Sequence, residues 1–165
     1  MSETEYEALA VDARSLPAIL PLLAAFAETD ACRWSAEALT ALAWNRLADA
    51  MFHIWAVVEK GGLEPVGFLV AQLQPASTGP EMFVLAAYIT PGTGAGAAVA
   101  LGKVVDRWAV SFGLTEILAR TKRGTENGLS EPRAWKKLGY EYDSTLLRRS
   151  LRAPLKSSGG KEEES

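Results

Sequence analysis

The sequence predicts a single α/β (α+β) domain that contains an antiparallel hairpin, and three observations support this. The chain has 165 residues, of which 48% are hydrophobic, so it can bury one sizeable core. Strand-like runs alternate with stretches whose apolar residues recur every three to four positions, as on one face of a helix. The runs "FHIWAVVE" and "VGFLVAQLQ" flank the turn residues "KGGLEP", a pattern typical of two paired antiparallel strands.

The first part of the chain predicts one strand and two helices. "EYEALAVDA" alternates weakly and predicts the strand. Ser15 is expected to cap the first helix, with Pro17 in its first turn, while Pro21 is expected to bend this helix or delay its start. Ser35 is expected to cap the second helix. The predicted buried faces are Leu16, Ile19, Leu20 and Leu23 in the first helix and Leu39, Leu42, Ala43 and Leu47 in the second.

After the hairpin, "MFVLAAYIT" is almost wholly apolar and predicts a strand buried on both faces. A helix is expected next, with Gly113 as its stop. Its apolar face is formed by Leu101, Val104, Val105, Trp108, Ala109 and Phe112. "TEILART" predicts a further strand, "RAWKKLG" a short helix and "YEYDSTLLRRSL" a closing strand. We expect one domain over residues 1–152 and a disordered polar tail over residues 153–165.

Composition and charge exclude several classes of function. The net charge of -3 gives no general attraction to nucleic acid or to an anionic membrane. The single cysteine, Cys32, and the single histidine, His53, argue against a disulfide, a metal centre and a Ser-His-Asp triad. The acidic start has no signal-peptide character, and the apolar stretch at residues 16–27 is too short to span a bilayer. A cytoplasmic protein without metal, nucleic-acid or membrane partners is therefore expected.

The stretch "PGTGAGAAVA" places small residues between a strand and a helix, where they favour close approach of a ligand to the backbone. A P-loop would end in Gly-Lys-Ser/Thr, which this stretch lacks. The stretch also matches the Gly-x-Gly-x-x-Ala pattern of a dinucleotide-binding turn. That turn belongs to a repeated strand–helix series, and this chain has too few strands and helices to form one. N–H groups at a helix start do attract anions without a lysine. The other interpretation is that the glycines only allow tight packing.

The order of elements and several short motifs resemble those of the GNAT superfamily of N-acetyltransferases. Thr93 to Ala98 resembles the family's Arg/Gln-x-x-Gly-x-Gly/Ala turn, with Thr93 in place of the basic or amide residue. "PVGF" resembles the opening of the family's third strand, "YITP" the exit of the fourth, and "RAWKKLGYE" a late segment of the family. The resemblance covers about residues 5–152. It implies a mixed, mostly antiparallel sheet flanked by helices, with a splay between the fourth and fifth strands.

The resemblance also implies acetyl-CoA, or another acyl-CoA, as the cofactor. By this match the backbone of Tyr88 and Ile89 would bond to the pantetheine arm. Asn127 lies one residue from the position where the family often has a cofactor-contacting asparagine. The residues expected to hold the pyrophosphate are Thr93, Gly94, Ala95, Gly96, Ala97 and Ala98.

The usual catalytic groups of the family are not matched. Val84–Ala87, in the middle of the predicted fourth strand, contains no ionisable side chain, and Trp135 stands where the family often has a tyrosine acid. Glu81 lies eight residues from Ile89, or about 26 Å along an extended strand, which is too far for a base acting at the thioester. Tyr88 is the best remaining candidate for proton transfer, although it can equally be a packed aromatic residue.

Two interpretations follow. The first is an N-acetyltransferase that relies on positioning and backbone N–H groups, with a small-molecule or protein amine of unknown identity as acceptor. The second is an inactive GNAT-like domain that binds acyl-CoA or a protein partner. The resemblance implies that the first two helices and the late loops build the acceptor pocket. The residues that either face this pocket or belong to the core and surface are Trp34, Trp44, Arg33 and Arg46. Whether the chain forms a homodimer is left open.

Overall fold

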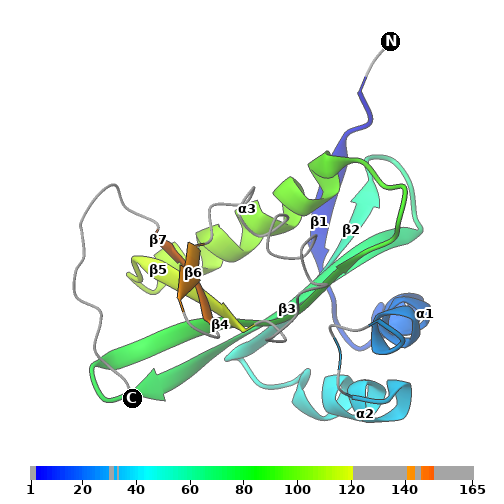
Figure 1. The fold of residues 1–165 in the computed structure, drawn as a ribbon. Helices are drawn as coiled ribbons and strands as arrows, with labels where there is room; N and C mark the ends of the chain where they lie inside the picture. Colours follow the sequence, from blue (N-terminus) through cyan, green and yellow to red (C-terminus); the bar gives the residue numbers. More distant parts are fainter. Residues whose placement is uncertain (1–2, 30–31, 33, 121–140, 144–145, 151–165) are drawn as a thin grey trace.

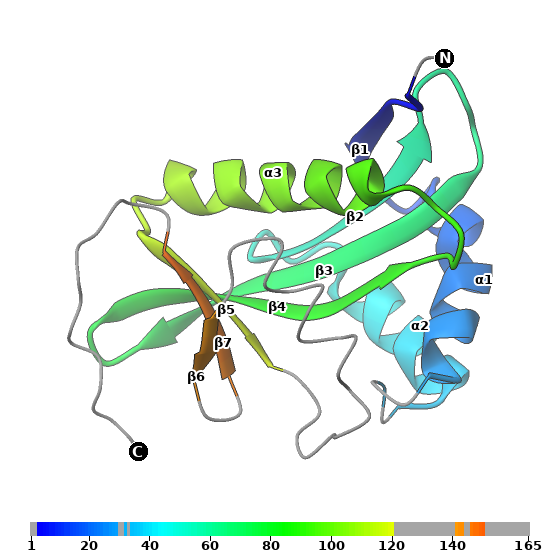
Figure 2. The ribbon, with the colours of Figure 1, turned by 45° about the horizontal axis from the view of Figure 1, so that its top comes forward.

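The computed structural model describes residues 3–29, 32, 34–120, 141–143 and 146–150. It forms a seven-stranded sheet in the order β1-β2-β3-β4-β5-β7-β6, with α1 and α2 on one face and α3 on the other (Figures 1 and 2). The elements are β1 (Tyr6–Ala10), α1 (Leu16–Ala27), α2 (Ala36–Arg46), β2 (Phe52–Glu59), β3 (Pro65–Ala76), β4 (Gly79–Ile89), α3 (Ala95–Ser111), β5 (Glu116–Arg120), β6 (Glu141–Asp143) and β7 (Leu146–Ser150).

Both predicted N-terminal helices are present, but only the second is capped as expected. The hydroxyl of Ser35 accepts the N–H of Ala38 at 3.1 Å, which satisfies one free donor of the first turn of α2. Ser15 precedes α1 without capping it, because its hydroxyl bonds to Asp12 instead, 3.1 Å from Oδ1. The expected delay at Pro21 is wrong, since α1 already begins at Leu16 and Pro21 lies inside it.

The sheet is antiparallel except where β4 and β5 pair in parallel, because α3 carries the chain back across the sheet between them. α3 ends as predicted, with Gly113 at φ +76° and the N–H of Leu114 bonded to the carbonyl of Ala109 at 3.1 Å. The closing segment forms two strands, β6 and β7, instead of the single strand predicted. The mixed, mostly antiparallel sheet flanked by helices is confirmed. The short helix predicted at "RAWKKLG" and the tail at 153–165 lie outside the described residues.

Each face of the sheet carries its own apolar core. On the α3 face, the buried residues of α3, among them Leu101 and Val105, pack on β2, β3, β4 and β5. On the other face, Leu16 and Ile19 of α1 and Leu39 of α2 pack on Phe68, which is fully buried. Among the described residues, no helix combines the length and apolar character needed to cross a membrane. The two helical layers hold β3 and β4 between them.

Gly67 allows β3 and β4 to approach closely at the end of β4 that leads into α3. A Cβ at Gly67 would lie 2.7 Å from the carbonyl oxygen of Tyr88 and 2.9 Å from Cδ1 of Ile89. Both distances are shorter than real Cβ contacts, and the first is to backbone, which cannot simply rotate away. The glycine in "PVGF" is thus required by the path of β4.

Gly67→Ala is therefore expected to destabilise the protein by about 1–3 kcal/mol, the usual cost of forcing extra atoms into a packed site. Urea unfolding followed by circular dichroism measures this change. Leu63→Ala, in the preceding turn, is the control, because Leu63 is 94% exposed and its truncation is expected to change stability by less than about 0.5 kcal/mol. Equal stability of Gly67→Ala and the unsubstituted protein would contradict the close approach.

Candidate functional site

Among the described strands, β5 pairs with β4 only in the middle of β4. The pairing between β4 and β5 comprises Phe83 with Leu118 and Val84 with Ala119, and Figure 2 shows the two strands pointing apart beyond this contact. On the other side, Ala71 pairs with Val84 but Val70 pairs with Ala86, so Leu85 is an extra residue that bulges from β4. The bulge and the end of the pairing with β5 coincide at Leu85.

The prediction that this strand is buried on both faces is therefore only half correct. Met82, Phe83 and Val84 are buried, but Leu85 is 44% exposed and residues 86–89 are only partly buried. Burial on both faces needs neighbours on both edges, and among the described strands only β3 pairs with β4 beyond Val84.

Register decides which backbone groups face the open edge of β4. The N–H of Thr90 donates to the carbonyl of Val66 on β3 at 2.8 Å. Because backbone groups of a strand alternate between its two edges, Tyr88 and Ala86 also bond to β3, whereas Ala87 and Ile89 direct their N–H and C=O groups to the open edge. Of the two backbones predicted to meet a pantetheine arm, that of Ile89 lies on this edge and that of Tyr88 faces β3.

The predicted phosphate-binding turn lies directly after this edge. Gly92 takes φ +90°, and the N–H of Thr93 donates to the carbonyl of Thr90 at 3.1 Å. α3 then begins at Ala95 with Gly94 as an N-cap that has no side chain to offer. Ala97 donates to the carbonyl of Gly94, and Ala98 follows it in the first turn.

The first two amides of α3, those of Ala95 and Gly96, keep no partner among the described contacts, as expected for the start of a helix. Gly94, Ala95 and Gly96 are all exposed. This end of the helix can therefore receive an anion without displacing a helical hydrogen bond.

A tyrosine that no pattern in the sequence points to lies against this turn. The hydroxyl of Tyr6, at the start of β1, accepts the N–H of Gly94 at 3.2 Å. A Cβ on Gly96 would lie 3.1 Å from Cδ2 of the Tyr6 ring. Tyr6 lies 88 residues before Gly94, so only the fold, which packs α3 on β1 (Figure 2), brings them together.

Tyr88 faces the α1 side of the sheet. Its ring packs edge-on against Phe26 and tilted against Phe68, with centroids 6.2 Å apart in both cases. The side chain is partly buried, and among the described contacts its hydroxyl has no hydrogen-bond partner. Tyr88 is thus both a packed aromatic residue and a hydroxyl available for bonding, one residue beyond Ala87 on the open edge.

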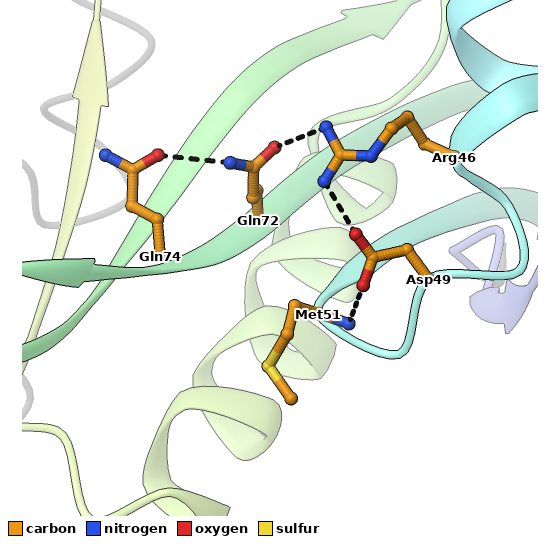
Figure 3. A network of polar contacts seen from close by, with 5 residues as sticks. All are labelled: Arg46, Asp49, Met51, Gln72 and Gln74. Atoms are coloured by element: carbon orange, nitrogen blue, oxygen red, sulfur yellow. Dashed lines mark hydrogen bonds and ion pairs between the residues drawn. The ribbon is translucent and has the colours of Figure 1, made fainter.

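A polar network connects α2 with β3 on the same face (Figure 3). Arg46 donates to Gln72 at 3.2 Å and to Asp49 at 2.8 Å, and Gln72 donates in turn to Gln74 at 3.1 Å. The N–H of Met51 and then Arg46 lower the pKa of the Asp49 carboxyl. Gln72 lies opposite Phe83, two residues before the bulge. No sequence pattern distinguishes these glutamines, because polar residues in a strand are usually solvated.

Glu81 pairs with Gln74 near the start of β4, at the opposite end from Ile89. Among the described residues, no group of three His, Cys, Asp or Glu side chains is arranged to hold a metal ion. Asn127, Trp135 and the remaining polar residues of the late loop lie outside the described residues.

A cavity of about 390 Å³ lies away from the turn, between the end of β1, the end of α2 and the start of β2. Asp12, Trp44, Asp49 and His53 are among its lining residues, with a largely apolar remainder. His53 stacks on Trp108 of α3 with ring centroids 4.3 Å apart. Burial lowers the pKa of His53 below its usual value.

No family model matches the sequence, and no curated protein matches it. Among solved structures, a protein described as an acetyltransferase of the GNAT family, from Desulfovibrio desulfuricans, superposes with a TM-score of 0.72 at 13% identity, covering 89% of this chain and 99% of that one. The chain has the GNAT fold. The splay between β4 and β5, predicted from the resemblance, is the feature of this fold that shapes the site.

Two further solved structures, both described as acetyltransferases, also match. An aminoglycoside N-acetyltransferase solved in complex with CoA has a TM-score of 0.66 at 14% identity, over 96% of this chain and 98% of that one. A ribosomal-protein-alanine N-acetyltransferase from Brucella melitensis has a TM-score of 0.59 at 22% identity, over 76% and 87%. These GNAT structures differ in their acceptors, so the shared fold does not specify one for this chain.

The lowered pKa of His53 predicts a pH dependence of stability. The unfolded chain gains a proton at His53 near pH 6.5, whereas the folded protein gains it only at lower pH. Stability should therefore decrease as the pH falls below about 6.5 and level off once folded His53 is protonated. Urea unfolding of the unsubstituted protein and His53→Gln between pH 7.5 and 5 measures this. Identical pH profiles would contradict it.

Proposed function

We propose that this protein is an acyl-CoA-dependent N-acetyltransferase that transfers an acetyl group to an amine. The observation that carries the proposal is the edge of β4 beyond Val84, which pairs with no described strand and leaves the backbone groups of Ala87 and Ile89 open, followed directly by the exposed start of α3. An extended chain of amides can bond along such an edge as an added strand. A pyrophosphate attached to that chain would then reach the helix start.

The residues present fit an acyl-CoA. The exposed N–H groups of Ala95 and Gly96 would take the pyrophosphate, and Ala87 and Ile89 would take the amides of the pantetheine arm. When bound, acyl-CoA supplies an activated thioester. The chain itself contributes backbone hydrogen bonds that orient the arm, and the N–H groups near the bulge at Leu85 can stabilise negative charge on a carbonyl oxygen.

Proton transfer is assigned to Tyr88 or to water. An alkylammonium acceptor must lose a proton before it attacks, and the thiolate that leaves gains one. On this strand, Tyr88 is the residue with a hydroxyl near the open edge, and Val84–Ala87 offers none. Asp49 and Glu81 are unsuitable as bases, because Asp49 bonds to Arg46 and Glu81 lies at the far end of β4.

Binding of acetyl-CoA, followed by isothermal titration calorimetry, is the first test, with release of free CoA measured against a panel of amines. We expect both binding and acceptor-dependent release. Binding without release from any amine would favour the alternative of an inactive acyl-CoA-binding domain. No binding of any acyl-CoA would overturn the proposal altogether.

Ala87→Pro tests the open edge directly. Proline removes the N–H that faces the ligand but breaks no bond to β3, since the ladder in this segment runs through Ala86 and Tyr88. The loss of one hydrogen bond is expected to weaken acetyl-CoA binding about two- to tenfold. Ala87→Ser keeps the N–H and is the matched control. Equal dissociation constants for the two variants would contradict this use of the edge.

Tyr88→Phe tests the proton-transfer role. If the Tyr88 hydroxyl handles a proton, kcat should fall by about 100-fold while the dissociation constant of acetyl-CoA stays the same, because the ring is retained. Stopped-assay kinetics with saturating amine, beside calorimetry, separate the two quantities. An unchanged kcat would mean that water carries the proton instead.

A further inference from the structure

Tyr6 occupies the space that the two glycines of the turn leave free. Its hydroxyl lies 3.2 Å from the nitrogen of Gly94 and 3.3 Å from where a Gly94 Cβ would be. Its ring lies 3.1 Å from the position of a Gly96 Cβ, and the carbonyl of Thr4 follows at 4.0 Å. Gly94 and Gly96 are therefore matched to a side chain of this protein, quite apart from any ligand.

This contact adds a hydrogen bond to the packing of β1 against α3, in which Tyr6 and Ala8 lie against the core residues of the helix. β1 is an edge strand that pairs with β2, and α3 starts at the end of β4, three strands away. Gly94 has no side chain with which to cap α3. The bond between Thr93 and Thr90 fixes one side of the turn, and the hydroxyl of Tyr6 fixes the other.

With the N–H of Gly94 bonded to Tyr6, the next two amides, of Ala95 and Gly96, stay exposed at the start of α3. Their direction depends on the orientation of the first helical turn, which the ring of Tyr6 supports at Gly96. We propose that Tyr6 is a positioning residue, which holds the first turn of α3 so that these amides meet the diphosphate of the acyl-CoA. This inference rests on the proposed function.

Tyr6 also compensates for a missing side chain, because Thr93 stands where the family's turn has a basic or amide residue. A turn without that side chain depends more heavily on correctly directed backbone donors. Tyr6 provides that direction from β1, through one hydroxyl and one ring face. A purely structural role would alter stability and leave ligand selectivity unchanged, so the two roles differ in what they predict.

Tyr6→Phe removes the hydroxyl and keeps the ring. The dissociation constant of CoA, measured by calorimetry, should rise about two- to tenfold, since one hydrogen bond that orients the turn is lost. The KM for acetyl-CoA should rise by a similar factor with kcat unchanged. The KM for S-acetylpantetheine, which has no diphosphate, should stay the same.

Leu9→Ala is the control, because it removes an apolar side chain from the other face of β1 without touching the turn. Because Leu9 is 46% exposed, this change should alter the melting temperature little and leave CoA binding unchanged. The inference is overturned if Tyr6→Phe binds CoA at least as tightly as the unsubstituted protein. It is also overturned if the KM for S-acetylpantetheine rises by the same factor as the KM for acetyl-CoA. If the unsubstituted protein binds no acyl-CoA, the proposed function fails, and this inference fails with it.

A double-mutant cycle tests the ring contact without any ligand. Gly96→Ala places a Cβ 3.1 Å from the ring of Tyr6 and should lower the melting temperature. In the background of Tyr6→Ala the ring is absent, and the same Gly96→Ala change should raise the melting temperature, because alanine favours a helix over glycine. Gly96→Ala effects of the same sign in both backgrounds would overturn the contact on which the positioning role depends.

Discussion

The structure depends on the point at which β4 parts from β5. β4 is held by β3 along its whole length, but β5 pairs with it only at Phe83 and Val84. The extra residue at Leu85 bends the strand where that pairing stops. α3 starts only a short turn after the end of β4. The edge of β4 that pairs with no described strand and the exposed start of α3 therefore lie next to each other.

An unpaired edge inside a sheet has a physical cost, because backbone N–H and C=O groups need partners. At the outer edge of a sheet water supplies them, and proteins protect such edges with charges, bulges or coverings. The described part of β4 beyond Val84 carries none of the charges, since Leu85–Ile89 contains no ionised side chain. An apolar, open edge between two helical layers is suited to an extended amide-bearing ligand, which is why the edge carries the functional proposal more than any side chain does.

The sequence was sufficient for most of the described elements but not for their fine placement. Apolar periodicity and glycines located α3 and the hairpin of β2 and β3 correctly, because these signals are local. The bulge at Leu85 has no local signature, since a leucine among apolar neighbours fits a regular strand equally well. The hydroxyl of Ser15 was assigned to a helix cap by residue type, yet Asp12 lies close enough to compete for it. Register, which decides between Tyr88 and Ala87, follows only from long-range pairing.

Tyr6 shows why a small-residue turn is ambiguous when only the sequence is known. The absence of a Cβ at Gly94 and Gly96 gives room to whatever lies nearest, and in this fold the nearest group is a tyrosine from β1. The room beside Gly94 and Gly96 is therefore not in itself evidence that the turn binds a phosphate. The amides of Ala95 and Gly96 differ in this respect, because no side chain of the described residues takes them. The anion-binding argument belongs to those two donors, whereas the missing side chains of Gly94 and Gly96 leave the room that Tyr6 occupies.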